Sequence, residues 1–113
     1  MKVAFRQVGD VTIATLEGRL AGGAGDIVLR EVINDLLAQG RKKILLDLSG
    51  VPSIDSSGIG ELVLSRKVAL ELDAEIRILR ATEGVQRVLS MVQILPLFEI
   101  HRNEAEALER FAS

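Results

Sequence analysis

The pattern of hydrophobic and polar positions changes from strand-like to helix-like as the chain proceeds. Residues 3–8 and 11–16 both carry apolar side chains at strand spacing, and Gly9-Asp10 separates the two runs. Alternation on either side of a Gly-Asp turn is typical of two antiparallel strands joined by a tight turn. The chain is therefore predicted to open with a β-hairpin.

Helical and strand-like patterns then alternate to the end of the chain. Apolar residues spaced three or four apart predict helices that begin at Asp26 and stop at Gly40, and that cover residues 57–72, 85–92 and 105–111. Short apolar runs predict strands at 44–48, 76–79 and 97–100. The order β-β-α-β-α-β-α-β-α predicts a single α/β domain over residues 1–113, with a mixed sheet opened by the hairpin and about four helices packed against it.

Composition narrows the classes of function. The 113 residues are 48% hydrophobic and 27% charged, and 14 basic against 16 acidic side chains give a net charge of −2. This balance is that of a globular protein, and it argues against a nucleic-acid binder, as does an aromatic content of 3%. Apolar stretches are shorter than the roughly 18 residues of a membrane span. We expect a soluble, cytoplasmic protein that neither inserts into membranes nor binds nucleic acid.

The sequence offers little material for catalysis or metal binding. It contains no cysteine and one histidine, His101, which is expected to close an edge strand. It also lacks the Gly-x-Ser-x-Gly elbow of serine hydrolases. The glycine-rich run 22–26 has neither the dinucleotide nor the P-loop spacing, and Asp26 would repel a phosphate, so a turn is predicted there. We expect no cofactor, no metal and no enzymatic activity.

The connection between the strand at 44–48 and the next helix is the most informative segment. Asp55, Ser56 and Ser57 are residue types that cap helix N-termini. Capping does not explain Gly58 and Gly60, each of which costs about 1 kcal/mol against alanine inside a helix. Either close packing on a neighbouring strand or close approach of a partner must offset this cost. Small exposed hydroxyls beside accessible backbone indicate a docking and modification site.

These residues resemble the signature of a known family. The strand Leu46-Asp47-Leu48, followed after a turn by Ile54-Asp55-Ser56-Ser57-Gly58-Ile59-Gly60, is similar to the signature of STAS domains. The nearest class is that of the bacterial anti-sigma factor antagonists of the SpoIIAA and RsbV type. The resemblance extends over the whole chain, and it implies a binding module and kinase substrate rather than an enzyme.

In that class the serine that follows the aspartate is phosphorylated by the anti-sigma factor, which is itself a serine kinase. By position this is Ser56. The resemblance implies that the unphosphorylated protein binds the anti-sigma factor and frees the sigma factor, that the phosphorylated protein is released, and that a separate phosphatase restores it. The expected partner-binding residues are Ser53, Asp55, Ser57, Gly58, Ile59, Gly60 and Leu64.

Two alternatives within the same family stay open. The alternatives are the small STAS subunit of a lipid-transport ABC complex and a stressosome-type scaffold, neither of which needs a phosphoserine cycle. Antagonists often carry an aspartate shortly after the glycine that ends the second strand, and Ala21 stands at that position here. With Arg19 nearby, the local charge is more positive, which is consistent with a different kinase, weak phosphorylation or constitutive action.

The helix at 57–72 also predicts which side chains a partner would meet. One stripe of the helix carries Ile59, Leu62, Val63, Arg66 and Leu70, of which Ile59, Leu62 and Val63 are predicted to face the sheet. Its outward-facing residues are predicted to be Glu61, Leu64, Ser65, Lys67 and Val68. Leu64 and Val68 are one helical turn apart, so they are candidates for an apolar contact patch.

Overall fold

The computed structural model describes residues 1–112 and has the predicted order of elements. Its strands are β1 (Lys2–Val8), β2 (Val11–Glu17), β3 (Lys43–Gly50), β4 (Glu75–Leu79) and β5 (Ile100–His101). Its helices are α1 (Ala24–Ala38), α2 (Ser56–Glu71), α3 (Glu83–Met91) and α4 (Glu104–Ala112), with a 3₁₀ turn at Leu95–Leu97. None of the helices in this part of the chain is long and apolar enough to cross a membrane.

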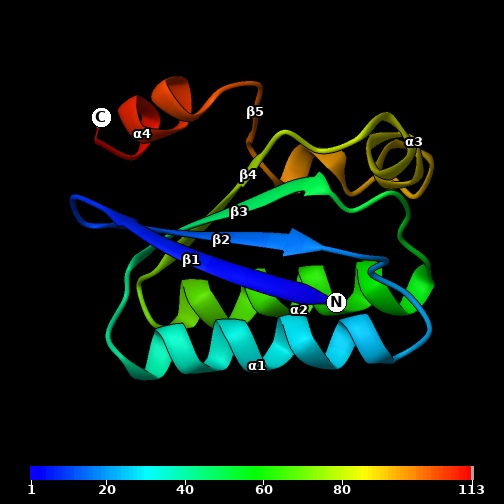
Figure 1. The fold of residues 1–113 in the computed structure, drawn as a ribbon, viewed down its shortest axis with the longest axis horizontal. Coiled ribbons are helices and arrows are strands. Elements are labelled where there is room, and N and C mark those ends of the chain that lie inside the picture. Colours follow the sequence, from blue (N-terminus) through cyan, green and yellow to red (C-terminus); the bar gives the residue numbers. More distant parts are fainter. Residues whose placement is uncertain (113) are drawn as a thin grey trace.

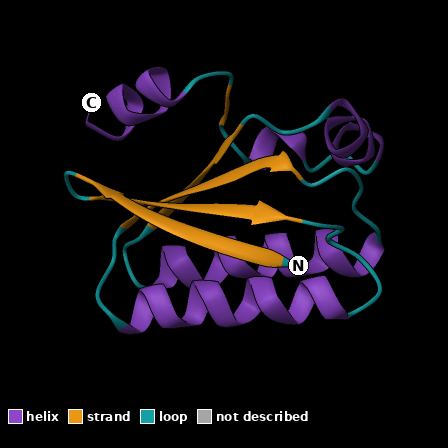
Figure 2. Ribbon diagram, in the orientation of Figure 1, coloured by secondary structure: helices purple, strands orange, loops and turns teal. Residues whose placement is uncertain are grey.

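The five strands form one mixed sheet in which spatial order follows sequence order (Figure 1). β1 pairs antiparallel with β2 along its whole length, from Lys2 opposite Glu17 to Val8 opposite Val11. All later pairs are parallel. Successive crossovers that advance in one direction place their helices on one face of a sheet, because such crossovers are right-handed. Accordingly, α1 and α2 lie side by side under the same face (Figure 2).

The sheet buries side chains on both faces, which explains the continuous apolar run of β3. On one face, Leu46 and Leu48 join the main core with α1 and α2. On the other face, Leu45 belongs to a smaller core with Ala107 and Phe111 of α4. Central parallel strands covered on both sides read as unbroken hydrophobic runs. The predicted α/β architecture is therefore confirmed.

The strand predicted at 97–100 is wrong in position and length. The chain makes a 3₁₀ turn at Leu95–Leu97, where the Leu97 N–H donates to the Ile94 carbonyl at 3.0 Å, and only Ile100–His101 pair with β4. Pro96 has no N–H to contribute to a ladder, which favours the turn. His101 does lie on the edge strand, as predicted, but its ring is 2% exposed and sits 3.4 Å from both Arg77 and Glu106.

The inward face of α2 also differs from the prediction. Glu61 and Ser65, expected to face outward, are buried, whereas Leu70 is exposed. The reason is that α2 contacts α1 as well as the sheet, so a second stripe of its surface is covered. Arg30 of α1 pairs with Glu61, with 2.7 Å between Nη2 and Oε1. The burial of Glu61 could not be predicted from the spacing of apolar residues, because it depends on an ion pair with a residue of another helix.

We predict that Phe111→Ala destabilises the protein by about 3 kcal/mol, because the buried ring fills the core under α4 and alanine leaves a cavity. Chemical denaturation monitored by circular dichroism measures the loss. Glu109→Ala, on the exposed side of the same helix, is the matched control and is expected to stay within about 0.5 kcal/mol of wild type. Equal losses in both variants would contradict the packing assigned to α4.

Candidate functional site

The predicted site lies where the chain leaves β2 and β3 and runs toward α1 and α2. The two segments pair with each other beyond the regular sheet. The Leu20 N–H donates to the Ser53 carbonyl at 3.1 Å, and the Asp55 N–H donates to the Leu20 carbonyl at 3.3 Å. Leu20 also forms an isolated parallel bridge with Ile54. The residues around Ser56 are thus held by a second segment from more than 30 positions earlier.

Asp55 is the polar centre of this region. Its Oδ1 accepts hydrogen bonds from the Gly58 N–H at 3.0 Å and from the Ser57 hydroxyl at 2.8 Å, while its Oδ2 accepts one from the Gly22 N–H at 2.9 Å. These donors, with the Gly58 and Gly22 amides as the largest contributors, lower the pKa of Asp55 to about 2. Asp55 therefore caps α2, as predicted, and also ties that helix to the turn before α1.

The two glycines of the motif, Gly58 and Gly60, have different surroundings. A Cβ added to Gly58 would lie 2.1 Å from the Leu20 carbonyl oxygen, so close packing excludes any side chain. Gly25 of α1 is excluded in the same way, with 2.3 Å to the Arg19 carbonyl oxygen. By contrast, a Cβ on Gly60 would meet nothing within 4 Å. Packing therefore offsets the cost of Gly58 but not that of Gly60.

The two serines also differ. Ser56 is the first residue of α2 and is exposed, and within residues 1–112 its hydroxyl makes no hydrogen bond. The hydroxyl of Ser57 donates to Asp55. A reagent that approaches α2 from solvent therefore meets a free hydroxyl at Ser56 and a bonded one at Ser57.

A shallow hollow of about 200 Å³ opens beside Asp55, lined also by Arg19, Ala21 and Gly22. Arg19 extends along it and donates from Nε to the Ser53 hydroxyl at 3.0 Å. The methyl group of Ala21 is small and Gly22 has no side chain, so this hollow stays open. Ala21 thus lies beside Asp55, the residue that precedes Ser56.

The other predicted partner-binding residues differ in their exposure to solvent. Ser53 contacts Arg19, and Gly60 and Leu64 face solvent, with Leu64 46% exposed. Ile59 is half-buried and packs against the main core. The site therefore presents Ser53, Ser56, Gly60 and Leu64 outward, while Gly58 and Ile59 attach it to the fold.

Sequence reasoning missed two features of the structure. Asp47, within β3, pairs with Arg80, with 2.8 Å between Oδ2 and Nη2, and accepts the Ser49 N–H at 3.0 Å. Although burial raises it, the hydrogen bonds from Ser49 and Arg80 lower the pKa of Asp47. The carbonyls of residues 19 and 20, which exclude side chains at Gly25 and Gly58, were the other omission. The one sequence signal for these close carbonyl contacts is that α1 and α2 each carry a glycine in the first turn, Gly25 and Gly58.

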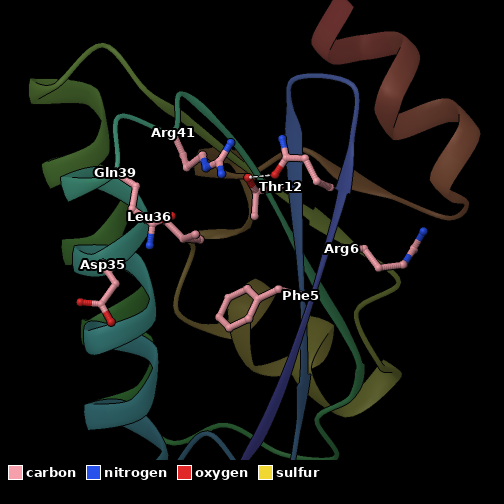
Figure 3. A pocket seen from close by; sticks show the side chains of 8 residues that line it. Phe5, Arg6, Thr12, Asp35, Leu36, Gln39 and Arg41 are labelled. Atoms are coloured by element: carbon pink, nitrogen blue, oxygen red, sulfur yellow. Dashed lines mark hydrogen bonds between the residues drawn. The ribbon is translucent and has the colours of Figure 1, made fainter.

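A second hollow, of about 350 Å³, lies between the hairpin and the end of α1 (Figure 3). Phe5 forms one wall, and Arg6 points away from it. None of the residues predicted for the site lines this hollow. Across residues 1–112 there is also no cluster of three histidine, aspartate or glutamate side chains placed to hold a metal ion.

Comparison with known proteins matches one family over nearly the whole chain. The STAS domain family matches residues 2–107. A Thermotoga neapolitana protein, provisionally named an anti-sigma factor antagonist, is 31% identical over 105 residues, which are 93% of each chain. A crystal structure of a provisionally named anti-sigma factor antagonist from Thermotoga maritima has a TM-score of 0.85 and 26% identity, and covers 98% of this chain and 95% of its own.

The fold is also that of SpoIIAA, an anti-sigma factor antagonist solved in two states. Its unphosphorylated form has a TM-score of 0.77 at 21% identity, with coverage of 98% of this chain and 96% of its own. The phosphorylated form, from Bacillus, has a TM-score of 0.73 at 18% identity, with coverage of 97% and 99%. At these identities the likeness concerns the fold.

We predict that Asp55→Asn lowers stability at pH 7 and that this difference from wild type shrinks in acid. The pKa of Asp55 falls from 3.8 to about 2 on folding, so its charge stabilises the folded state above pH 3.8, and this contribution is lost as the pH falls toward 2. Denaturation at pH 7, 4 and 2.5 measures the difference, with the exposed Asp35→Asn as background. A difference that persists undiminished at pH 2.5 would contradict the assignment.

We predict opposite effects for alanine at the two motif glycines. Gly58→Ala is expected to destabilise by about 2 kcal/mol, because its methyl group would overlap the Leu20 carbonyl. Gly60→Ala is expected to stabilise by about 0.5–1 kcal/mol through helix propensity, because the added methyl meets open space. The denaturation midpoints of the two variants, each the control for the other, check the signs. Destabilisation by Gly60→Ala would show that its surroundings are occupied.

Proposed function

The chain belongs to the STAS domain family, and on that premise we propose that it is an anti-sigma factor antagonist whose partner binding is controlled by phosphorylation of Ser56. The family match and the names of its relatives support the role of a regulatory binding protein. The observation that carries the proposal is the contrast between the two serines: the hydroxyl of Ser56 is exposed and unbonded, while that of Ser57 is held by Asp55.

The fold tolerates a phosphate at this position. Phosphoserine brings roughly −1.5 to −2 charges and three acceptor oxygens. At the N-terminus of an exposed helix such a charge is favourable by about 0.3–1 kcal/mol. The effect of phosphorylation therefore acts on an interface, where a dianion next to Asp55 is desolvated and meets charges of the partner. SpoIIAA, which has the same fold, has been solved with and without phosphate.

The proposed partner is an anti-sigma factor that is also a serine kinase. The Ser56 oxygen attacks the γ-phosphorus of ATP, the bond from that phosphorus to the bridging oxygen breaks, and ADP leaves with the electron pair. A base of the kinase takes the hydroxyl proton. A separate phosphatase then uses water to return the hydroxyl and release inorganic phosphate. The unphosphorylated protein binds the anti-sigma factor and so makes the sigma factor available.

The surface proposed for the partner runs from Ser53 across Ser56 to Gly60 and Leu64. Because Gly60 has no side chain and nothing lies within 4 Å of its added Cβ, a partner backbone can approach the helix closely there. Leu64, one turn further along α2, offers exposed apolar area next to this approach. Contact with the partner would then offset the helix-propensity cost of Gly60, which packing within the chain does not offset.

We predict that Ser56→Asp weakens binding to the anti-sigma factor by about ten-fold or more, through like-charge repulsion at the interface. Ser56→Ala is expected to bind like wild type and to accept no phosphate from ATP and the kinase. Affinity purification from the native cell identifies the partner, and titration of the purified pair measures binding. Phosphopeptide mass spectrometry reports the site. Ser57→Ala is the matched control and keeps phosphorylation at Ser56.

Two outcomes would count against the proposal. If a transport ATPase or a large scaffold binds wild type, Ser56→Ala and Ser56→Asp equally, the motif serves as a helix cap in another type of STAS module. If Ser56→Asp unfolds the protein, as judged by circular dichroism and thermal melting, the switch acts on the fold and not on the interface.

A further inference from the structure

The hollow beside Asp55 contains one cationic side chain with unused donors. Arg19 is exposed, and its Nε donates to the Ser53 hydroxyl at 3.0 Å. Within residues 1–112, no carboxylate oxygen lies within 4.0 Å of its guanidinium group. Both Nη groups of Arg19 are therefore available to an anion that enters from solvent.

A phosphate on Ser56 would create a local excess of negative charge. The preceding residue, Asp55, has a pKa of about 2 and is ionised at neutral pH. It cannot turn away from the phosphate without losing its bonds to Gly22, Ser57 and Gly58. A nearby cation offsets the repulsion between such a dianion and this fixed carboxylate.

Arg19 lies beside Asp55, the residue that precedes Ser56, and it has the chemistry to bind a phosphate. It lines the same hollow as Asp55, and the small residues Ala21 and Gly22 leave about 200 Å³ of open space there. Arg19 is the only cationic side chain that lines the described hollow. A guanidinium group binds phosphate through two parallel N–H···O bonds, which a lysine ammonium cannot do.

We infer that Arg19 is the residue that pairs with the phosphate on Ser56, exchanging its contact with the Ser53 hydroxyl for a two-point bond to the phosphate oxygens. This inference rests on the proposed phosphorylation of Ser56. It gives the modification a second effect besides added charge. In the unphosphorylated protein Arg19 is free to contact an acidic group of the partner, and in the phosphorylated protein it is occupied.

The test uses the full chain with phosphoserine placed at position 56 during synthesis, so that no kinase is needed. ³¹P NMR titration measures the second pKa of the phosphate, which is ordinarily about 6. We expect it to be higher in Arg19→Gln than in the parent protein by about 0.5 unit, because the loss of a nearby cation favours protonation. Arg19→Lys is expected to fall between them. Arg41→Gln, which removes an exposed arginine that lines two other hollows, is expected to match the parent.

Salt gives a second check, since a surface ion pair weakens when the Debye length shortens. The difference between the parent and Arg19→Gln is expected to shrink between 0.05 and 1 M salt, as the Debye length falls to about 3 Å. Equal phosphate pKa values in the parent and in Arg19→Gln would overturn the pairing and leave the proposed partner binding standing. A clear difference, in a protein that binds no anti-sigma factor, would keep the pairing and remove the proposed function. Melting of the unphosphorylated variants confirms that they are folded.

Discussion

The contact between the chain at Arg19–Leu20 and the first turns of both helices is the constraint on which the site depends. Two carbonyl oxygens approach α1 and α2 so closely that only glycine fits at positions 25 and 58. This fixes the two helix N-termini side by side against the end of β2. Asp55 then bonds across the junction to Gly22, so a single carboxylate both caps α2 and connects it to the turn before α1.

Most of the fold could be predicted because hydrophobic spacing and turn residues carry local information. The hairpin at Gly9-Asp10 and the buried strand β3 follow from such patterns. The errors arose where neighbours outside the local segment decide burial. Glu61 is buried because Arg30 on another helix pairs with it, and the last strand begins later than predicted because the turn at Leu95–Leu97 uses its expected first residue, Leu97. Neither the Arg30–Glu61 ion pair nor this turn can be predicted from the spacing of apolar residues.

The candidate site was predictable to a similar extent. Residue types that cap helices identified Asp55, and the unexplained glycines marked the segment as unusual. The different roles of Gly58 and Gly60 depend on the Leu20 carbonyl, which comes from a distant segment, so only the three-dimensional structure distinguishes them. The same holds for Ser56 and Ser57, which are equivalent as sequence letters and become distinct through one hydrogen bond. The phosphorylation proposed for Ser56 rests on this distinction between the two neighbours.

The position of α4 has a consequence for biosynthesis. Each strand of the sheet adds beside the one before it, so the sheet and its α1–α2 layer can assemble while the ribosome is still translating. The opposite face, with Ile13, Leu45 and Leu79, has no cover from α4 until Phe111 has left the exit tunnel. During that interval the nascent chain presents an apolar sheet surface of the kind that chaperones bind.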